Sequence, residues 1–167
     1  MLSVRSFLVA GAFAVGALFV QSPAFAQAPP PYGAPLSYEA AKKAMAAAEA
    51  EATKNKWPVA IAILDTTGTL VMFSKLENTQ TGSVAIAMGK AKTALDFRRA
   101  SKSFQDTVAA GGDGLRVLGA AGIILPFEGG VPIIVDGKVV GAIGVSGVKS
   151  SEDAQVATAG ANAAAGK

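Results

Sequence analysis

The sequence predicts an α+β domain in which helices flank a mostly antiparallel sheet of five strands. Strand-like runs come in pairs, and turn signals at Asp65–Gly68 and Asp136-Gly137 join the members of each pair. Segments with helical character lie between the pairs and after them, instead of alternating with single strands. Strands joined by hairpins run antiparallel, so this order favours α+β over a parallel α/β sheet.

The first 26 residues are predicted to be a signal peptide and not part of the fold. Arg5 precedes an apolar run from Phe7 to Val20, and Ala24-Phe25-Ala26 fits the small-x-small pattern of a cleavage site. A retained membrane anchor is the alternative, but the apolar run is short for a spanning helix. We therefore expect cleavage before Gln27, a periplasmic or secreted location, and no membrane contact afterwards.

Residues 27–36 are predicted to be an extended leader, and residues 37–167 a single domain. The leader holds four prolines and Gly33, a composition that cannot build a core. In the domain, Ser37 can cap a helix that extends through an alanine-rich run to about Lys54.

The first strand pair is predicted at Val59–Leu64 and Leu70–Ser74, and the second helix at Gly82 or Ser83 to Arg99. The helix has an apolar stripe, predicted to be buried, and charged residues placed away from it. The stripe is Val84, Met88, Ala91 and Leu95, and the charged residues are Lys90, Lys92, Asp96 and Arg99.

A short helix is expected at Ser103–Ala109, followed by the glycine-rich run Gly111–Gly114. A further strand is expected before Leu125, which brings the count to five. The second hairpin spans residues 129–147, and its internal glycines Gly141 and Gly144 indicate a bulge or a close backbone approach, where the second helix crosses the sheet.

The last helix is expected at Ser150–Ala165, with Ser150 and Asp153 spaced as a capping box.

The composition excludes several kinds of site. The chain has no cysteine and no histidine, which removes disulfides, Ser-His-Asp catalysis, histidine zinc sites and histidine-ligated haem. No metal site is predicted. The net charge is +3, or +2 without Arg5, and the basic residues are scattered without stacking aromatic rings, so nucleic acid is not an expected partner.

Three blocks resemble the GlcG/HbpS-like family, also called the haem-binding or haem-degrading domain family. They are Ile63–Leu70, Ile86–Ala94 and Gly129–Gly147, with Glu152-Asp153 shortly after. The resemblance implies a profilin-like fold, assembly into homo-oligomers, and exported relatives that bind haem.

Six residues are candidates for ligand binding. Lys90 and Thr93 lie about one helical turn apart and could present an ammonium and a hydroxyl group to a carboxylate. Arg98 is a candidate partner for a haem propionate, Glu128 could supply a carboxylate, and Gly129-Gly130 could expose backbone amides. The alternatives are a solvated lysine and a glycine pair that only turns the chain.

Three functions remain open from the sequence. The first is an exported, oligomeric protein that binds a small molecule, either haem or another anionic aromatic ligand. Its propionate partners would be Lys90 and Arg98, and its iron ligand, if any, a tyrosine, methionine, lysine or weak oxygen donor. The second is an enzyme acting on a small organic acid, with Lys90 as acid or base and Glu128 as carboxylate. The third is a structural or partner-binding module. No catalytic residue is assigned.

Overall fold

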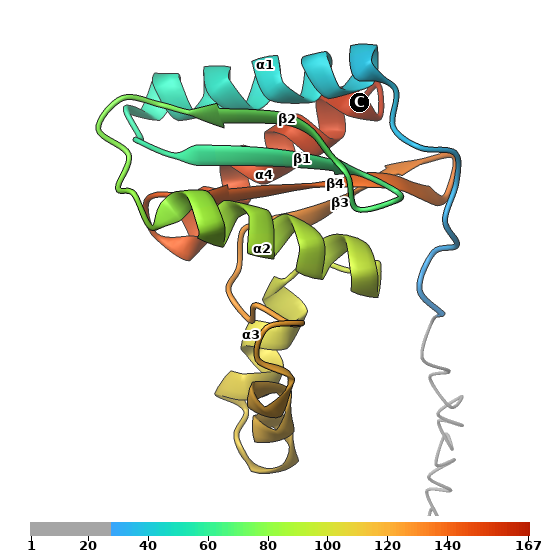
Figure 1. Cartoon of the computed structure of the whole chain (residues 1–167), viewed down its shortest axis with the longest axis vertical. Helices are drawn as coiled ribbons and strands as arrows, with labels where there is room; N and C mark the ends of the chain where they lie inside the picture. The colour runs from blue at the N-terminus through green and yellow to red at the C-terminus, as the bar shows by residue number, and fades with distance from the viewer. Residues whose placement is uncertain (1–27) are drawn as a thin grey trace, which may run out of the picture.

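The computed structural model describes residues 28–167 and shows a single antiparallel sheet between two layers of helices (Figure 1). The strand order in the sheet is β2-β1-β4-β3. The strands are β1 (Ala60–Asp65), β2 (Leu70–Lys75), β3 (Gly130–Val135) and β4 (Lys138–Ser146). The helices are α1 (Tyr38–Asn55), α2 (Ser83–Phe97), α3 (Lys102–Ala109), η1 (Gly112–Ala120) and α4 (Ser150–Ala164). The predicted signal peptide lies outside the described residues.

The α+β class is confirmed, but the prediction of five strands is wrong. The residues expected to hold a further strand form the 3₁₀ helix η1 and turns. Gly111 and Gly112 have positive φ angles of 70° and 53°, which break an extended run. The segment also projects away from the sheet, so no neighbouring strand is available to pair with it (Figure 1).

The core has two halves, one on each face of the sheet. Alternate residues of β1 face opposite sides, so Ile61 and Ile63 pack with α1 and α4, whereas Ala60 and Ala62 pack with α2. Gly144 of β4 confirms the predicted close approach: a Cβ at this position would overlap the Ala87 carbonyl oxygen of α2. Small residues therefore let α2 lie directly on the strands.

The leader takes part in the fold, although its composition predicted an extended segment without that role. Pro31 and Gly33 exchange backbone hydrogen bonds of 2.9 and 2.8 Å with Val139, and the Leu36 amide donates to Val140. The β1 ladder along β4 stops at Gly141, so the leader occupies the edge of β4 beyond that point. Leu36 is buried against the α1 side of the core.

Residues 101–128, which we call the arm, contain α3 and η1 and project from the body (Figure 1). The two ends of the arm meet at Ser101, which is fully buried. Its amide donates to the Gly130 carbonyl (3.0 Å), and its hydroxyl accepts from the Gly130 amide (2.8 Å) and donates to the Phe127 carbonyl (2.6 Å). The root of the arm is thus fixed to β3.

None of the helices within residues 28–167 is both long enough and apolar enough to cross a membrane.

Candidate functional site

Lys90 is buried, although it was predicted to lie on the solvent side of α2. Its ammonium group donates to an Asp153 carboxylate oxygen of α4 at 2.7 Å and to the Val145 carbonyl of β4 at 2.9 Å. Both side chains are only 2% exposed. The second carboxylate oxygen of Asp153 accepts the Val148 amide at 3.1 Å. This ion pair therefore ties α2 and α4 together across the end of β4.

The environment of this pair shifts both groups toward their neutral forms. Burial lowers the pKa of Lys90 and raises the pKa of Asp153, because removal from water penalises each charged form. The hydrogen bond and the charge attraction between the two groups oppose both shifts. The short contact offsets part of the cost of burying the two charges, since each charge compensates the other.

Helix α4 begins differently from the prediction, which releases Asp153 for this contact. The carboxylate of Glu152 accepts the Lys149 amide at 3.1 Å and so closes the first turn. Ser150 and Asp153 do not form the predicted capping box. The sequence does contain one signal for this. Glu152 is also acidic and could cap the helix, which would leave Asp153 available for another contact.

The buried stripe of α2 also differs from the prediction at Met88, which is 39% exposed. The helix turns toward the sheet a face centred on Ala87, Ala91 and Ala94, so Met88 lies beside this face. Lys92 and Asp96, which lie one helical turn apart and away from this face, form an ion pair at 2.7 Å.

Five of the six candidate residues gather along one line between α2 and β3. The Thr93 hydroxyl accepts the Leu125 amide at 2.8 Å, and the Glu128 amide donates to the Gln105 side chain at 2.9 Å. Gly129 has a φ of 123°, and a Cβ there would lie 2.8 Å from the Lys90 ammonium nitrogen. A Cβ at Gly130 would overlap the Lys90 carbonyl oxygen. Lys90, Thr93 and the glycine pair thus hold the returning end of the arm.

Arg98, the sixth candidate, lies apart from this group. Its guanidinium donates to the Pro30 carbonyl at 3.2 Å and lies 5.2 Å from the centre of the Tyr32 ring. The Tyr32 hydroxyl in turn donates to the Leu95 carbonyl at 2.9 Å. Arg98 therefore anchors the leader to the C-terminal end of α2.

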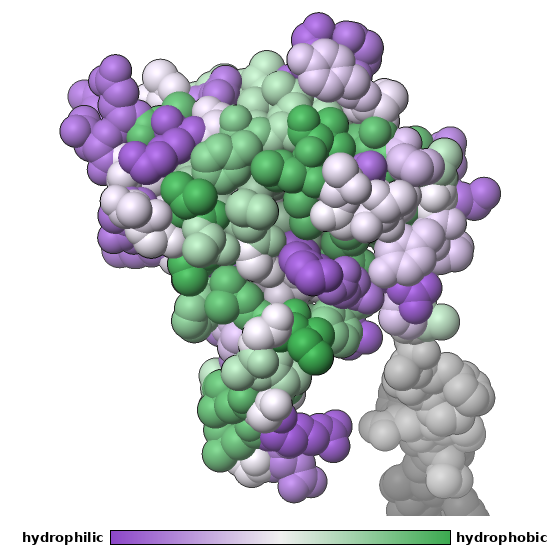
Figure 2. Space-filling model, viewed as in Figure 1, coloured by the Kyte–Doolittle hydropathy of each residue, from purple (hydrophilic) through white to green (hydrophobic). Residues whose placement is uncertain are grey.

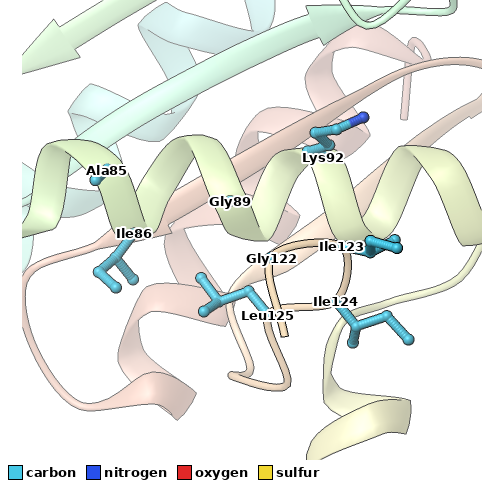
Figure 3. Close-up of a pocket in the computed structure, with 8 residues that line it drawn as sticks. All are labelled: Ala85, Ile86, Gly89, Lys92, Gly122, Ile123, Ile124 and Leu125. Atoms are coloured by element: carbon cyan, nitrogen blue, oxygen red, sulfur yellow. The ribbon is translucent and has the colours of Figure 1, made fainter. Parts of the chain in front are cut away.

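An apolar hollow of about 280 Å³ lies between the outer face of α2 and the end of the arm (Figure 3). The side chains of Ile86 and Leu125 line it, and Leu125 lies close to the helix backbone at Gly89, which has no side chain (Figure 3). Lys92 stands at the edge, with its side chain 58% exposed. The hollow can receive a flat apolar group, and Lys92 offers a cation to an acidic substituent.

The potential iron ligands differ in their access to a bound molecule. Met45 is 4% exposed in the core, whereas Tyr38 and Met88 are exposed. Within residues 28–167, no group of three or more acidic side chains gathers to hold a metal ion. A nucleophilic serine needs a basic side chain beside it. Ser146 of β4 is 6% exposed, and its hydroxyl donates to the Ser83 hydroxyl at 3.3 Å, which cannot serve as that base.

Comparison with known proteins places this architecture in a family. The family described as "Haem degrading protein HbpS-like" matches residues 36–162. The chain belongs to the HbpS-like family. Protein GlcG of Escherichia coli K12 is 38% identical over 106 residues, which cover 64% of this chain and 77% of that protein.

Two solved structures extend the similarity to three dimensions. A PduOC:haem complex matches with a TM-score of 0.70 and 27% identity, covering 77% of this chain and 94% of the other. HbpS matches with a TM-score of 0.69 and 27% identity, covering 86% and 96%. The resemblance noted in the sequence is therefore confirmed at the level of the HbpS-like family.

Proposed function

We propose that this HbpS-like protein binds haem, with one edge of the macrocycle in the hollow between α2 and residues 122–125. The observation that carries the proposal is an apolar hollow with an exposed lysine at its edge, in a fold similar to that of a solved PduOC:haem complex. Flat apolar ligands with acidic substituents suit sites that combine apolar walls with a few polar groups.

Lys92 is the cation that we assign to a haem propionate. The sequence suggested Lys90 and Arg98 for this role, but Lys90 is paired with buried Asp153 and Arg98 holds the leader. Lys92 has an exposed side chain, and its partner Asp96 lies on the same helix, where such pairs are weak. Lys90 then affects haem binding only indirectly. It packs closely against the Gly129-Gly130 turn, through which the chain leaves the arm.

The iron is held without histidine, since the chain has none. We assign no axial ligand. Tyrosine and methionine are established haem ligands, and Tyr38 and Met88 are exposed members of these types.

Titration of the protein with hemin, followed by the Soret absorbance band, tests the proposal. Gly89→Leu should fill the hollow, because even a Cβ at Gly89 would lie 2.9 Å from a Leu125 methyl carbon. We expect this change to weaken hemin binding more than about tenfold, equivalent to about 1.4 kcal/mol.

The matched control is Gly82→Leu, since an added Cβ at Gly82 has no atom within 4 Å and the residue precedes the same helix. The control should bind hemin like the wild type, and Lys92→Gln should weaken binding in low salt. A wild type that gives no Soret shift, or a Gly89→Leu variant with unchanged affinity, would rule out this site.

A further inference from the structure

A larger cavity, of about 880 Å³, lies beyond the C-terminal end of α2. Three segments that are far apart in the sequence line it, namely the leader, the two residues that follow α2, and the β3–β4 hairpin. Figure 1 shows these segments meeting at one end of the molecule. A cavity of this size can hold a small organic molecule. It shares no lining residue with the hollow beside the arm.

The end of α2 brings two arginines to this cavity. Consecutive side chains of an α-helix point about 100° apart around its axis, so neighbours along a helix face different surroundings. Arg98 has a φ of 53° and ends α2 in the left-handed conformation. The chain turns there, and Arg98 and Arg99 both line the cavity.

Both guanidinium groups are held in place while most of their N–H groups stay available. Arg98 lies 5.2 Å from the centre of the Tyr32 ring and donates one hydrogen bond, to the Pro30 carbonyl. Arg99 lies 5.6 Å from the centre of the Phe104 ring and donates one hydrogen bond, to the carbonyl two residues before it. A guanidinium has five N–H donors, so each arginine retains enough of them for a carboxylate.

The positive charge of the two arginines is not neutralised within the part of the chain that the structure describes. Neither arginine forms an ion pair there. The described residues that line the cavity include no acidic side chain. Figure 2 shows hydrophobic side chains along the arm but hydrophilic ones where the end of α2 meets the leader. The cavity is therefore suited to an anion.

The remaining walls are apolar. They are formed mainly by Pro29, Pro30 and Pro31 of the leader and by Ile134 of β3. Proline has no backbone N–H group to offer a ligand. The Pro30 and Pro31 carbonyls already accept hydrogen bonds from Arg98 and from the Val139 amide. These walls can thus contact the apolar body of a ligand, and the arginines its charged groups.

We propose that this cavity is a second binding site, for a small organic acid that carries two carboxylate groups on an apolar body. Each guanidinium can bind one carboxylate through two parallel N–H groups, a geometry that lysine does not provide. An inorganic anion would leave the proline and isoleucine walls without contact, which favours an organic ligand. The leader, which Arg98 and Tyr32 fasten to α2, supplies one wall of the site.

Isothermal titration calorimetry of the full chain with adipate, in a buffer of low ionic strength, tests the proposal. Adipate is the probe because its flexible chain lets the two carboxylates adjust to the positions of the guanidinium groups. We expect saturable binding of one adipate. Hexanoate, which lacks the second carboxylate, and inorganic phosphate, which lacks the apolar body, should each bind at least about tenfold more weakly.

Arg99→Gln should weaken adipate binding about tenfold or more, because it removes one charge and one fork of donors. Arg99→Lys should recover only part of the affinity, since lysine keeps the charge without the fork. Arg99 is exposed, and circular dichroism shows whether both variants remain folded. The matched control is Arg116→Gln, which removes an exposed arginine of η1 outside the cavity and should bind adipate like the wild type.

The hollow beside the arm is tested separately from this cavity. Gly89→Leu, which fills the hollow, should leave adipate binding unchanged, and adipate should not displace hemin. Displacement of hemin by adipate would show one shared site and overturn the proposal. It would also be overturned by a wild type that does not bind adipate, by unchanged affinity in Arg99→Gln, or by hexanoate that binds as tightly as adipate.

Discussion

At the scale of residues, the costliest feature is the pair of full charges that Lys90 and Asp153 place inside the protein. Each charge would be strongly unfavourable alone, and each is acceptable because the other lies 2.7 Å away and further hydrogen bonds complete its coordination. The pair joins residues 63 positions apart in the sequence. Hydrophobic periodicity describes one helix at a time, so it places a lysine on the solvent side unless its distant partner is known.

Lys90→Met should destabilise the protein by about 3–5 kcal/mol at pH 7, because Asp153 would remain buried without a counter-charge. Lys90→Met combined with Asp153→Asn should recover part of this loss. Urea unfolding followed by circular dichroism gives both free energies. Lys92→Met, which removes an exposed ion pair instead, should cost less than about 1 kcal/mol and serves as control.

The deficit of Lys90→Met should shrink in acid. Burial raises the pKa of Asp153 in the folded state above its ordinary value of 3.8, and the variant lacks the lysine that opposes this shift. A raised folded-state pKa stabilises the protein below the unfolded value, and that stabilisation is lost as the pH rises through the folded value. A deficit that stays constant between pH 7 and pH 4 would show that Asp153 is not an uncompensated charge in the variant.

At the scale of elements, small residues determine how the layers meet. Glycine in β4 and alanine in α2 bring helix and strand into backbone contact, and Gly160 of α4 similarly approaches the Ala44 carbonyl of α1. The close approach at Gly144 could be predicted as one of two possibilities, because glycine inside a strand marks either a bulge or a close backbone approach. The sequence could not show that the expected fifth strand does not form. A strand needs a neighbouring strand to pair with, and local sequence does not show that the arm leaves the sheet.

Gly144→Ala should destabilise the protein by about 2 kcal/mol or more, since its Cβ would overlap the Ala87 carbonyl oxygen and lie 2.9 Å from the Ala91 Cβ. Gly82→Ala adds the same methyl group where nothing lies within 4 Å, and it should change stability by less than about 0.5 kcal/mol. Thermal melting of both variants provides the comparison. Equal melting temperatures would mean that α2 can move away from the sheet at little cost.

At the scale of the whole molecule, the family, the α+β class and the main layers could be predicted from the sequence, whereas the arrangement of the candidate site could not. Five of the six predicted residues do lie together, but they hold the end of the arm instead of lining the hollow. Ile123, Ile124 and Leu125 line it from a segment whose apolar residues had been interpreted as a strand. Short apolar runs do not distinguish a strand from a loop that lines a pocket.

We propose that the protein is exported and that its chain is cut between Ala26 and Gln27. The described leader begins to contact the body at Pro30 and Pro31, a few residues beyond this position, so cleavage would leave those contacts intact. Intact-mass spectrometry of the protein recovered from the periplasm or medium should show a chain starting at Gln27. Recovery of only the uncut chain, beginning at Met1, would contradict export by this route.

The hydrogen bonds that join the two ends of the arm make it a modular insertion. Because Ser101 and Gly130 are already in contact, the length of the α3–η1 part of the arm affects the stability of the sheet mainly through the entropy of closing this loop. That entropy changes by only about 0.6 kcal/mol for each doubling of loop length. The part of the arm that lies away from its root can therefore change in length or sequence while α2 and β3 keep their places, so the surface that the arm presents can vary independently of the core.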